Sequence, residues 1–255
     1  MKNNVCLITG GAGFLGRKYC EFFLEKNYKV LCVDNNKSNL KKLSSIKTKN
    51  LNIFTCDITN EKSVKLLFNK INKTHFVNLL INNAAIDAVP FSDQKKNHKF
   101  PTISSWDKEL NVGLKGSFLM IKYFGEKMFQ KKNGSIINIG SDLSIIAPNQ
   151  NLYKSSYKNY IKPVTYSVIK HGLLGMTKYF ASLYAKNNVR VNMISPGPIQ
   201  NKQQRKFVNE LKKVIPMERL SHSTEILGSL SFLADSSSSY ITGQNIIVDG
   251  GRTII

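Results

Sequence analysis

The stretch TGGAGFLG, residues 9–16, decides how the start of the chain is expected to fold. It follows a short apolar run at 5–9 and opens an amphipathic stretch at about 14–26. Glycine permits a tight turn and a close approach to phosphate, and the following helix offers free N–H groups and a positive dipole to an anion. A plain strand-to-helix turn would not need four glycines. The stretch therefore predicts a pyrophosphate site with five candidate contacts: Gly10, Gly13, Phe14, Leu15 and Gly16.

Short apolar runs alternate with longer amphipathic stretches along the rest of the chain. Runs rich in Val, Ile and Leu with little alternation are typical of parallel strands covered on both faces. Strands are expected at 5–9, 29–33, 51–55, 79–82, 135–139, 190–194 and 245–248. Helices are expected at about 14–26, 36–48, 60–72, 103–131, 164–186 and 223–234. This order predicts one α/β domain over residues 1–255, with a doubly wound, seven-stranded, mostly parallel sheet and helices on both faces.

Three connections are longer than this pattern requires. They span about 87–104, 142–163 and 196–221, and each follows the carboxyl end of a predicted strand. Ligands of such sheets bind outside those ends, and long loops there are more often functional than not. We expect these three segments to be substrate loops.

The net charge is the unusual feature of the composition. The chain has 37 Lys and Arg against 16 Asp and Glu, a formal charge of +21. Nucleic acid, an anionic membrane surface or an acidic substrate would explain it, and so would a compositional bias, because 32 of the cations are Lys and they are spread throughout. No nucleic-acid-binding motif or Arg-rich run is present, so no specific nucleic-acid partner is expected. Locally, the cations of 154–162 and 202–213 are expected to flank the site and to favour a polar or anionic small-molecule substrate.

The sequence also lacks the features of membrane-spanning, secreted and metal-binding proteins. No stretch of about 18 uncharged apolar residues occurs and no long apolar segment follows the start, so neither a membrane span nor a secretory signal is expected. The cysteines Cys6, Cys20, Cys32 and Cys56 lack the paired spacing of metal sites. They are expected to be buried small hydrophobes in a cytoplasmic protein without a bound metal or disulfide framework.

Two carboxylates follow predicted strands. Asp34, 18 residues after Gly16, could accept both ribose hydroxyls of an adenosine and would repel a 2′-phosphate. It favours NAD over NADP, although Arg17 and Lys37 lie nearby in the sequence. Asp57 and the adjoining Ile58 could contact the adenine edge. Each carboxylate could instead cap the helix that follows it.

Tyr166 and Lys170 lie four residues apart and therefore on one face of a predicted helix. A nearby cation lowers the pKa of a phenol toward working pH and makes it a usable general acid or base. Tyr123 and Lys127 have the same spacing, but they lie deep in the preceding helix, where a surface pair is the simpler interpretation. Tyr166 instead begins its helix after a loop that carries Ser141, which could donate a hydrogen bond to a substrate carbonyl.

The order of these segments resembles the short-chain dehydrogenase/reductase family over essentially the full length. Further matching pieces are residues 82–85, Asn192, Pro196 with Gly197, and residues 242–251. The resemblance implies a Rossmann-type fold, a nicotinamide cofactor and hydride transfer between a carbonyl and an alcohol.

The resemblance also implies residue roles. Tyr166 would be the proton donor or acceptor, Lys170 would bind the nicotinamide ribose and tune Tyr166, and Ser141 would orient the substrate oxygen. Cofactor contacts are implied for Tyr166, Lys170, Asn83, Ala84, Ala85, Pro196 and Gly197.

The chain departs from the family pattern in three places. The glycine turn has the spacing of the longer, sugar-nucleotide-modifying branch, although the C-terminal half follows the shorter branch. Gly113 stands where the family usually has an Asn, so the usual proton-relay water is in doubt. Ser141 and Tyr166 are 25 residues apart instead of about a dozen, which leaves an aromatic and basic insert that is expected to project over the site.

These departures resemble a bacterial subgroup associated with flagellin glycosylation and nonulosonic-acid sugars. The leading hypothesis is an NAD(P)-dependent oxidoreductase that acts on a polar carbonyl or alcohol. The expected substrate is a sugar derivative in surface-glycan or flagellin-glycan biosynthesis. A 3-oxoacyl-carrier-protein reductase is the alternative, and a non-catalytic cofactor sensor or nucleic-acid-binding protein is the alternative of another class. By the same resemblance, a homodimer or homotetramer is expected.

Overall fold

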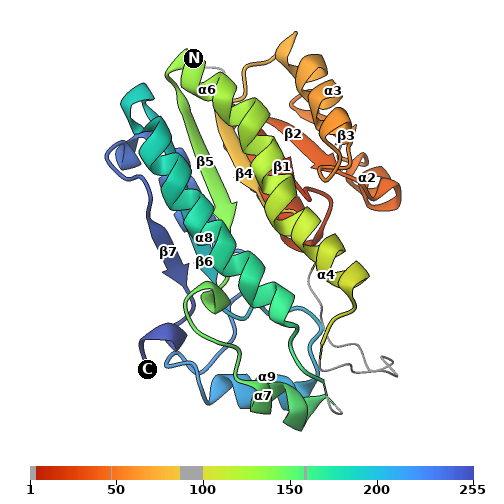
Figure 1. Cartoon of the computed structure of the whole chain (residues 1–255), viewed down its shortest axis with the longest axis vertical. Coiled ribbons are helices and arrows are strands. Elements are labelled where there is room, and N and C mark those ends of the chain that lie inside the picture. The colour runs from red at the N-terminus through yellow and green to blue at the C-terminus, as the bar shows by residue number, and fades with distance from the viewer. Residues whose placement is uncertain (1–3, 47, 87–99, 158–159) are drawn as a thin grey trace.

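A single parallel sheet forms the centre of the molecule (Figure 1). The computed structural model describes residues 4–46, 48–86, 100–157 and 160–255. The strand order is β3-β2-β1-β4-β5-β6-β7, and all six neighbouring pairs are parallel. The strands are β1 (Val5–Thr9), β2 (Lys29–Asp34), β3 (Leu51–Thr55), β4 (Leu79–Asn82), β5 (Gly134–Ile139), β6 (Val189–Pro196) and β7 (Asn245–Val248). The predicted fold is confirmed, and the strand bounds agree with the predicted ones to within two residues.

The strand order reverses direction at β1, which pairs with β2 on one side and with β4 on the other. The connections from β1 and β4 therefore leave toward opposite faces, and a crevice opens between them at the carboxyl edge. This is the place where open α/β sheets bind their ligands.

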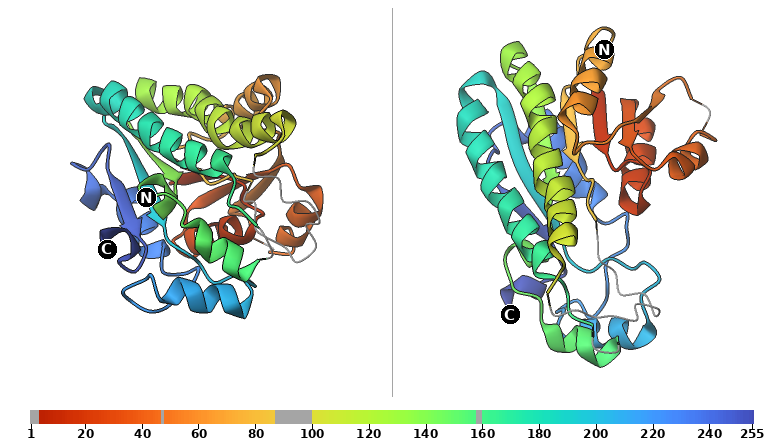
Figure 2. Two further views of the ribbon diagram at one scale, coloured as in Figure 1. Left: turned by 60° about the horizontal axis from the view of Figure 1, so that its bottom comes forward. Right: turned by 45° about the vertical axis from the view of Figure 1, so that its right-hand side comes forward.

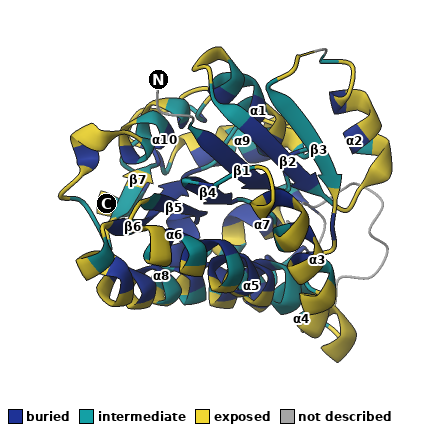
Figure 3. Ribbon diagram, turned by 90° about the horizontal axis from the view of Figure 1, so that it is seen from above, coloured by how far each residue is buried: buried dark blue, intermediate teal, exposed yellow. Residues whose placement is uncertain are grey.

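Helices cover both faces of the sheet, as Figure 3 shows from above. They are α1 (Phe14–Glu25), α2 (Lys37–Leu43), α3 (Glu61–Asn72), α4 (Ile103–Leu110), α5 (Ser117–Met120), α6 (Glu126–Lys131), α7 (Gln150–Ser156), α8 (Val164–Tyr184), α9 (Arg205–Lys212) and α10 (Leu227–Ala234). The segments Asn111–Gly116 and Ile121–Gly125 have π-helical bonding, and they join α4, α5 and α6 into one continuous helix over 103–131. That helix has the predicted bounds.

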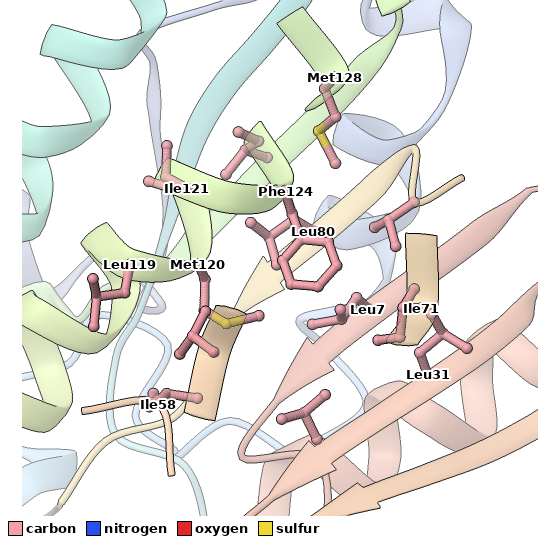
Figure 4. Close-up of a cluster of buried hydrophobic side chains, with 14 of the residues drawn as sticks. Leu7, Leu31, Ile58, Ile71, Leu80, Leu119, Met120, Ile121, Phe124 and Met128 are labelled. Atoms are coloured by element: carbon pink, nitrogen blue, oxygen red, sulfur yellow. The ribbon is translucent and has the colours of Figure 1, made fainter. Parts of the chain in front are cut away.

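The two faces of the sheet bury separate apolar cores. One core joins Leu7 and Leu80 of the sheet to Phe124 and Met128 of the long helix, as Figure 4 shows. The other lies under α1, α2 and α10 and includes Ile8, Phe23 and Leu230. Because both faces of the central strands are covered, β1 and β4 consist almost entirely of apolar residues that solvent does not reach.

Two predicted helices have different bounds in the structure. The helix expected at 36–48 ends at Leu43, because the hydroxyls of Ser44 and Ser45 bond back to main-chain carbonyls of the last turn. The helix expected at 223–234 begins only at Leu227, after a turn in which the Glu225 carboxylate accepts the N–H of His222.

The second and third long connections each contain a helix that the sequence analysis did not predict. These helices, α7 and α9, lie side by side beyond the carboxyl edge of the sheet (Figure 2). Tyr153 and Tyr157 each pack against Phe207 with ring centroids 5.1 Å apart. The result is a third apolar cluster, separate from the two cores of the sheet. The first connection, 87–104, lies mostly outside the described residues.

The long helix approaches α8 closely at two glycines. A Cβ atom on Gly113 would lie 2.5 Å from Cγ2 of Ile169, and one on Gly172 would lie 2.9 Å from a methyl group of Leu114. Contacts this short force neighbouring side chains to move. Gly113 therefore sets the separation of the two helices.

This packing predicts opposite outcomes for two glycine substitutions. Gly113→Ala should lower the free energy of unfolding by about 1–3 kcal/mol, because the added methyl overpacks against Ile169. Gly175→Ala in α8 is the matched control, because its Cβ meets nothing within 4 Å, and it should stabilise by about 0.5–1 kcal/mol. Urea unfolding of the two variants measures the difference, and equal effects would contradict this account of the helix contact.

Candidate active site

The glycine turn between β1 and α1 is shaped by contacts that exclude side chains. Gly10 has a φ of +62°, and a Cβ there would lie 2.8 Å from the Cα of Ala84. A Cβ on Gly16 would collide with the carbonyl oxygen of Gly10. The N–H of Gly13 donates to that same oxygen at 3.1 Å and closes the turn.

The start of α1 suits an anion. No side chain caps α1, and its first turn holds no acidic residue. By contrast, the amide or hydroxyl oxygens of Asn36, Asn60 and Thr102 cap α2, α3 and α4. The main-chain N–H groups of the first turn of α1 are therefore left for a ligand, and the residues of this turn fit the pyrophosphate of a dinucleotide.

Thr9 and Asn83 tie the carboxyl ends of β1 and β4 together. The Thr9 hydroxyl accepts the N–H groups of Asn83 and Ala84 at 3.1 and 3.2 Å. The Asn83 side-chain amide donates to the carbonyls of Thr9 and Gly10 at 3.0 and 3.2 Å. These bonds hold the crevice at a fixed width.

Asp34 and Asp57 lie on the same edge, at the adenosine side expected for a dinucleotide. One Asp34 oxygen accepts the N–H of Ala12 at 3.1 Å and the other accepts the N–H of Asn36 at 2.9 Å. Asp34 thus contacts the glycine turn, and Asn36, not Asp34, caps α2.

Asp57 is likewise no helix cap in the structure. It accepts the N–H and hydroxyl of Thr59, and Asn60 caps α3. The Ile58 side chain belongs to the core, so a dinucleotide contact at this position would come from its main chain.

A cavity of about 260 Å³ brings together most of the predicted site residues. Its lining includes Phe14, Leu15, Asn83, Ala85, Ser141, Tyr166, Lys170, Pro196 and Gly197. Gly10, Gly13, Gly16, Asp34, Asp57, Ile58 and Ala84 lie outside this lining. The three predicted catalytic side chains therefore share one cavity with the predicted nicotinamide contacts, and the predicted adenosine contacts lie beyond it.

Lys170 is fixed beside Tyr166 at the end of β5. It is buried, and its Nζ donates to the carbonyl of Ile139 at 2.9 Å. The same Nζ lies 5.5 Å from the centroid of the Tyr166 ring. Tyr123 is placed differently, because its hydroxyl donates to Glu61 on α3 outside the cavity.

Ser141 follows β5 and is held by its neighbours. Its hydroxyl donates to Oδ1 of Asp142 at 2.8 Å and accepts the N–H of Leu143 at 3.2 Å. Asp142 also forms a buried ion pair with Arg252 near the C-terminus. Asp142 and Arg252 line the cavity, and neither was predicted from the sequence.

Gly113 cannot be replaced by the Asn of the family pattern without moving Ile169. The Ser117 hydroxyl, one turn further along the long helix, donates to the Gly113 carbonyl at 3.0 Å. At the position where the family has Asn, the long helix and α8 therefore pack too closely to admit a side chain.

The two basic segments, 154–162 and 202–213, contribute fewer charged groups to the cavity lining than expected. Among the described residues of the insert, only Lys162 brings an ammonium group to the lining, and Lys154 is exposed. From α9 the lining receives Phe207 and Leu211, whereas Lys206, Lys212 and Lys213 are exposed. Lys202 borders a neighbouring recess beside Gly13.

The described residues contain no group of His, Cys, Asp and Glu side chains that could hold a metal ion. All four cysteines are buried free thiols, and burial raises the pKa of Cys6. Within the described ranges, no helix combines the length and apolar character that a bilayer span requires.

Comparison with known proteins agrees with this geometry. A family model described as enoyl-(acyl carrier protein) reductase matches residues 12–253. A short-chain dehydrogenase of Leptospira borgpetersenii, solved with bound NAD⁺, is 30% identical and has a TM-score of 0.86, over 99% of this chain and 94% of that one. The chain belongs to the short-chain dehydrogenase/reductase family of oxidoreductases.

Two curated members of this short-chain dehydrogenase/reductase family show the range of its substrates. The NAD-dependent glycerol dehydrogenase of Listeria innocua is 30% identical over 258 residues, covering 99% of this chain and 94% of that enzyme. The 3-oxoacyl-[acyl-carrier-protein] reductase of Thermotoga maritima is 30% identical over 264 residues, covering 100% and 99%. Resemblance at this level gives the reaction class and leaves the substrate open.

The buried ion pair predicts a large cost when one partner is removed. Arg252→Met leaves the Asp142 carboxylate buried without its cation and should lower the free energy of unfolding by about 3–5 kcal/mol. The double variant Asp142→Asn/Arg252→Met should recover part of that loss. Lys213→Met, which breaks the exposed pair with Glu210, is the control and should cost less than about 0.5 kcal/mol. Urea unfolding measures all three, and a loss below about 1 kcal/mol for Arg252→Met would contradict the assigned role.

Proposed function

We propose that the chain transfers a hydride between a nicotinamide cofactor and a polar carbonyl or alcohol substrate. The observation that carries this proposal is the shared cavity of Ser141, Tyr166 and Lys170 beside the glycine turn. Family membership supports the same reaction class.

NAD is the proposed cofactor. The Asp34 carboxylate would accept the adenosine ribose hydroxyls and repel a 2′-phosphate. The NAD-dependent relative and the NAD⁺-bound neighbour support this choice. The recess lined by Arg17, Lys42 and Lys202 would favour a phosphate, so NADP is the alternative.

The side chains of the cavity have separate tasks in the proposed reaction. A nicotinamide held in this cavity would be the donor or acceptor of the hydride. The Tyr166 hydroxyl gives a proton to the substrate oxygen, or takes one from it, in the opposite sense to the hydride. The Lys170 ammonium, held by the Ile139 carbonyl, stabilises the phenolate that forms. The Ser141 hydroxyl donates to the substrate oxygen after it rotates away from Asp142.

The proposed substrate is a sugar derivative in surface-glycan or flagellin-glycan biosynthesis, as in the bacterial subgroup that the insert and Gly113 resemble. Support comes from the cavity wall, where Tyr153, Tyr157, Asn201 and Gln203 offer aromatic faces and polar groups suited to a hydroxylated ring. A 3-oxoacyl-carrier-protein substrate is the alternative, favoured by the Thermotoga maritima relative.

The proposed setting is a cytoplasmic homodimer or homotetramer. Exposed apolar side chains along α8, among them Val168, Tyr179 and Leu183, are suited to a subunit contact. Ile254 and Ile255 at the C-terminus are suited to a second. The four free thiols agree with a reducing compartment.

The proposed mechanism predicts the outcome of Tyr166→Phe. Turnover should fall by about 10²–10⁴-fold, because the proton carrier is removed, while NADH affinity stays nearly unchanged. Turnover is followed by nicotinamide absorbance, on the best substrate from a screen of polyols, sugar phosphates, nucleotide sugars and 3-oxoacyl thioesters. Tyr123→Phe is the control, because Tyr123 lies outside the cavity.

Two results would overturn the proposal. Turnover by Tyr166→Phe at the rate of the unaltered protein would remove the mechanism. A screen in which no substrate class is turned over, with NADH still bound, would favour a non-catalytic cofactor sensor.

A further inference from the structure

A turn near the C-terminus brings an arginine to the wall of the cavity. Asp249, directly after β7, accepts the N–H groups of Gly251 and Thr253 at 2.9 and 2.7 Å. Gly251 has a φ of +88°, a conformation that favours glycine. The turn packs on the predicted nicotinamide contact, because a Cβ on Gly197 would lie 2.7 Å from the Cα of Asp249. These contacts fix the backbone from which Arg252 reaches the cavity.

Arg252 meets a carboxylate that already holds the Ser141 hydroxyl. Its guanidinium donates to Oδ2 of Asp142, and both side chains are buried. The other oxygen, Oδ1, accepts the Ser141 hydroxyl and the N–H of Leu143, each at 2.8 Å. The two oxygens of Asp142 thus connect the C-terminal turn to the loop that carries Ser141.

The Ser141 hydroxyl has only one proton to donate. In the structure this proton is directed to Asp142, because a carboxylate can only accept. Donation to a substrate oxygen, which the proposed reaction requires, therefore breaks the bond to Asp142. A hydrogen bond to a carboxylate is about twice as strong as one between neutral groups, so Asp142 competes with the substrate for the proton.

Arg252 weakens this competition. Its guanidinium offsets the negative charge of Asp142. After the Ser141 hydroxyl turns to the substrate, Asp142 still accepts from Arg252 and from the N–H of Leu143. Without Arg252, the Leu143 N–H would be the one remaining donor to Asp142 among the described residues, and a buried carboxylate with so few partners is costly.

A purely structural task does not explain where this ion pair lies. A buried ion pair is often no more stable than apolar side chains of similar volume. The other ion pairs between described residues, such as Arg17 with Glu21, are partly exposed and lie outside the cavity lining. The pair of Asp142 and Arg252 is buried and adjoins the hydroxyl that the proposed reaction uses.

We propose that Arg252 is a positioning residue of this reaction, which holds the Asp142 carboxylate so that the Ser141 hydroxyl can leave it and donate to the substrate oxygen. The inference rests on the proposed function, because it takes Ser141 to serve that oxygen. Arg252 acts through Asp142 and Ser141, and the C-terminal turn becomes part of the active site.

A double-mutant cycle on stability tests this connection without any ligand. Ser141→Ala removes the hydroxyl, and urea denaturation measures the resulting loss of unfolding free energy in the unaltered chain and in Arg252→Met. The loss should be about twofold larger in Arg252→Met, where the hydroxyl donates to an unpaired carboxylate. Equal losses would overturn the inference. If Arg252→Met does not fold, Arg252→Gln, which is uncharged but keeps an N–H donor, is used in the same cycle with the same criterion.

Turnover tests the consequence for the reaction. With NADH and the substrate that the screen turns over fastest, Arg252→Met should lower kcat about tenfold and leave KM and NADH affinity nearly unchanged, because the Ser141 bond strengthens in the transition state. In a Ser141→Ala background the same substitution should lower kcat less than about twofold. A tenfold loss that persists there would overturn the inference, since Arg252 would then not act through Ser141.

Restoring and control variants sharpen the result. Arg252→Lys keeps the charge and should recover most of kcat. Asp142→Asn/Arg252→Met should also recover it, because an amide oxygen competes less strongly for the Ser141 proton. Failure of both to recover kcat would overturn the inference. Arg219→Met removes an exposed arginine that pairs with Glu225 outside the cavity lining, and it should leave kcat unchanged.

The outcomes separate this inference from the proposed function. If no screened substrate is turned over, the proposed function fails, and the stability cycle still decides whether Arg252 controls the Ser141 hydroxyl. If Ser141→Ala slows turnover and Arg252→Met does not, the proposed function stands and the role of Arg252 is overturned.

Discussion

The bonds between Thr9 and Asn83 are the constraint on which the site depends. They tie β4 to β1 where the strand order reverses, and so they fix the crevice beside the glycine turn. Gly10 packs so closely on Ala84 that no side chain fits between the two strand ends. A dinucleotide requires a backbone it can approach and a helix start that no side chain caps, and this edge provides both.

The opposite wall of the cavity comes from outside the sheet. The insert and the connection after β6 form α7 and α9, whose aromatic side chains pack on one another. This small cluster holds Gln150 and thereby Lys162, while Arg252 from the C-terminus holds Asp142 beside Ser141. The sheet edge thus presents the residues proposed for the reaction, and the added segments form the facing wall of the cavity.

The sequence was sufficient to predict the sheet, because strands covered on both faces are nearly continuous apolar runs. It did not reveal α7 and α9, because these helices are only seven and eight residues long and their buried side chains pack on each other in a cluster separate from the sheet. Tyr166, Lys170 and Ser141 could be predicted from the order of motifs. Asp142 and Arg252 could not, because they lie far apart in the sequence and only the fold pairs them. Lys162 was predicted only as one of the cations of 154–162 that flank the site, and the sequence did not distinguish it from the others.

A crystal structure of the full chain grown with NAD⁺ tests the central claim most directly. We expect the pyrophosphate at the N–H groups of Phe14 and Leu15, the adenosine ribose on Asp34, and the nicotinamide between Pro196 and Tyr166. A dinucleotide bound away from the glycine turn, or a nicotinamide directed away from Tyr166 and Lys170, would contradict it.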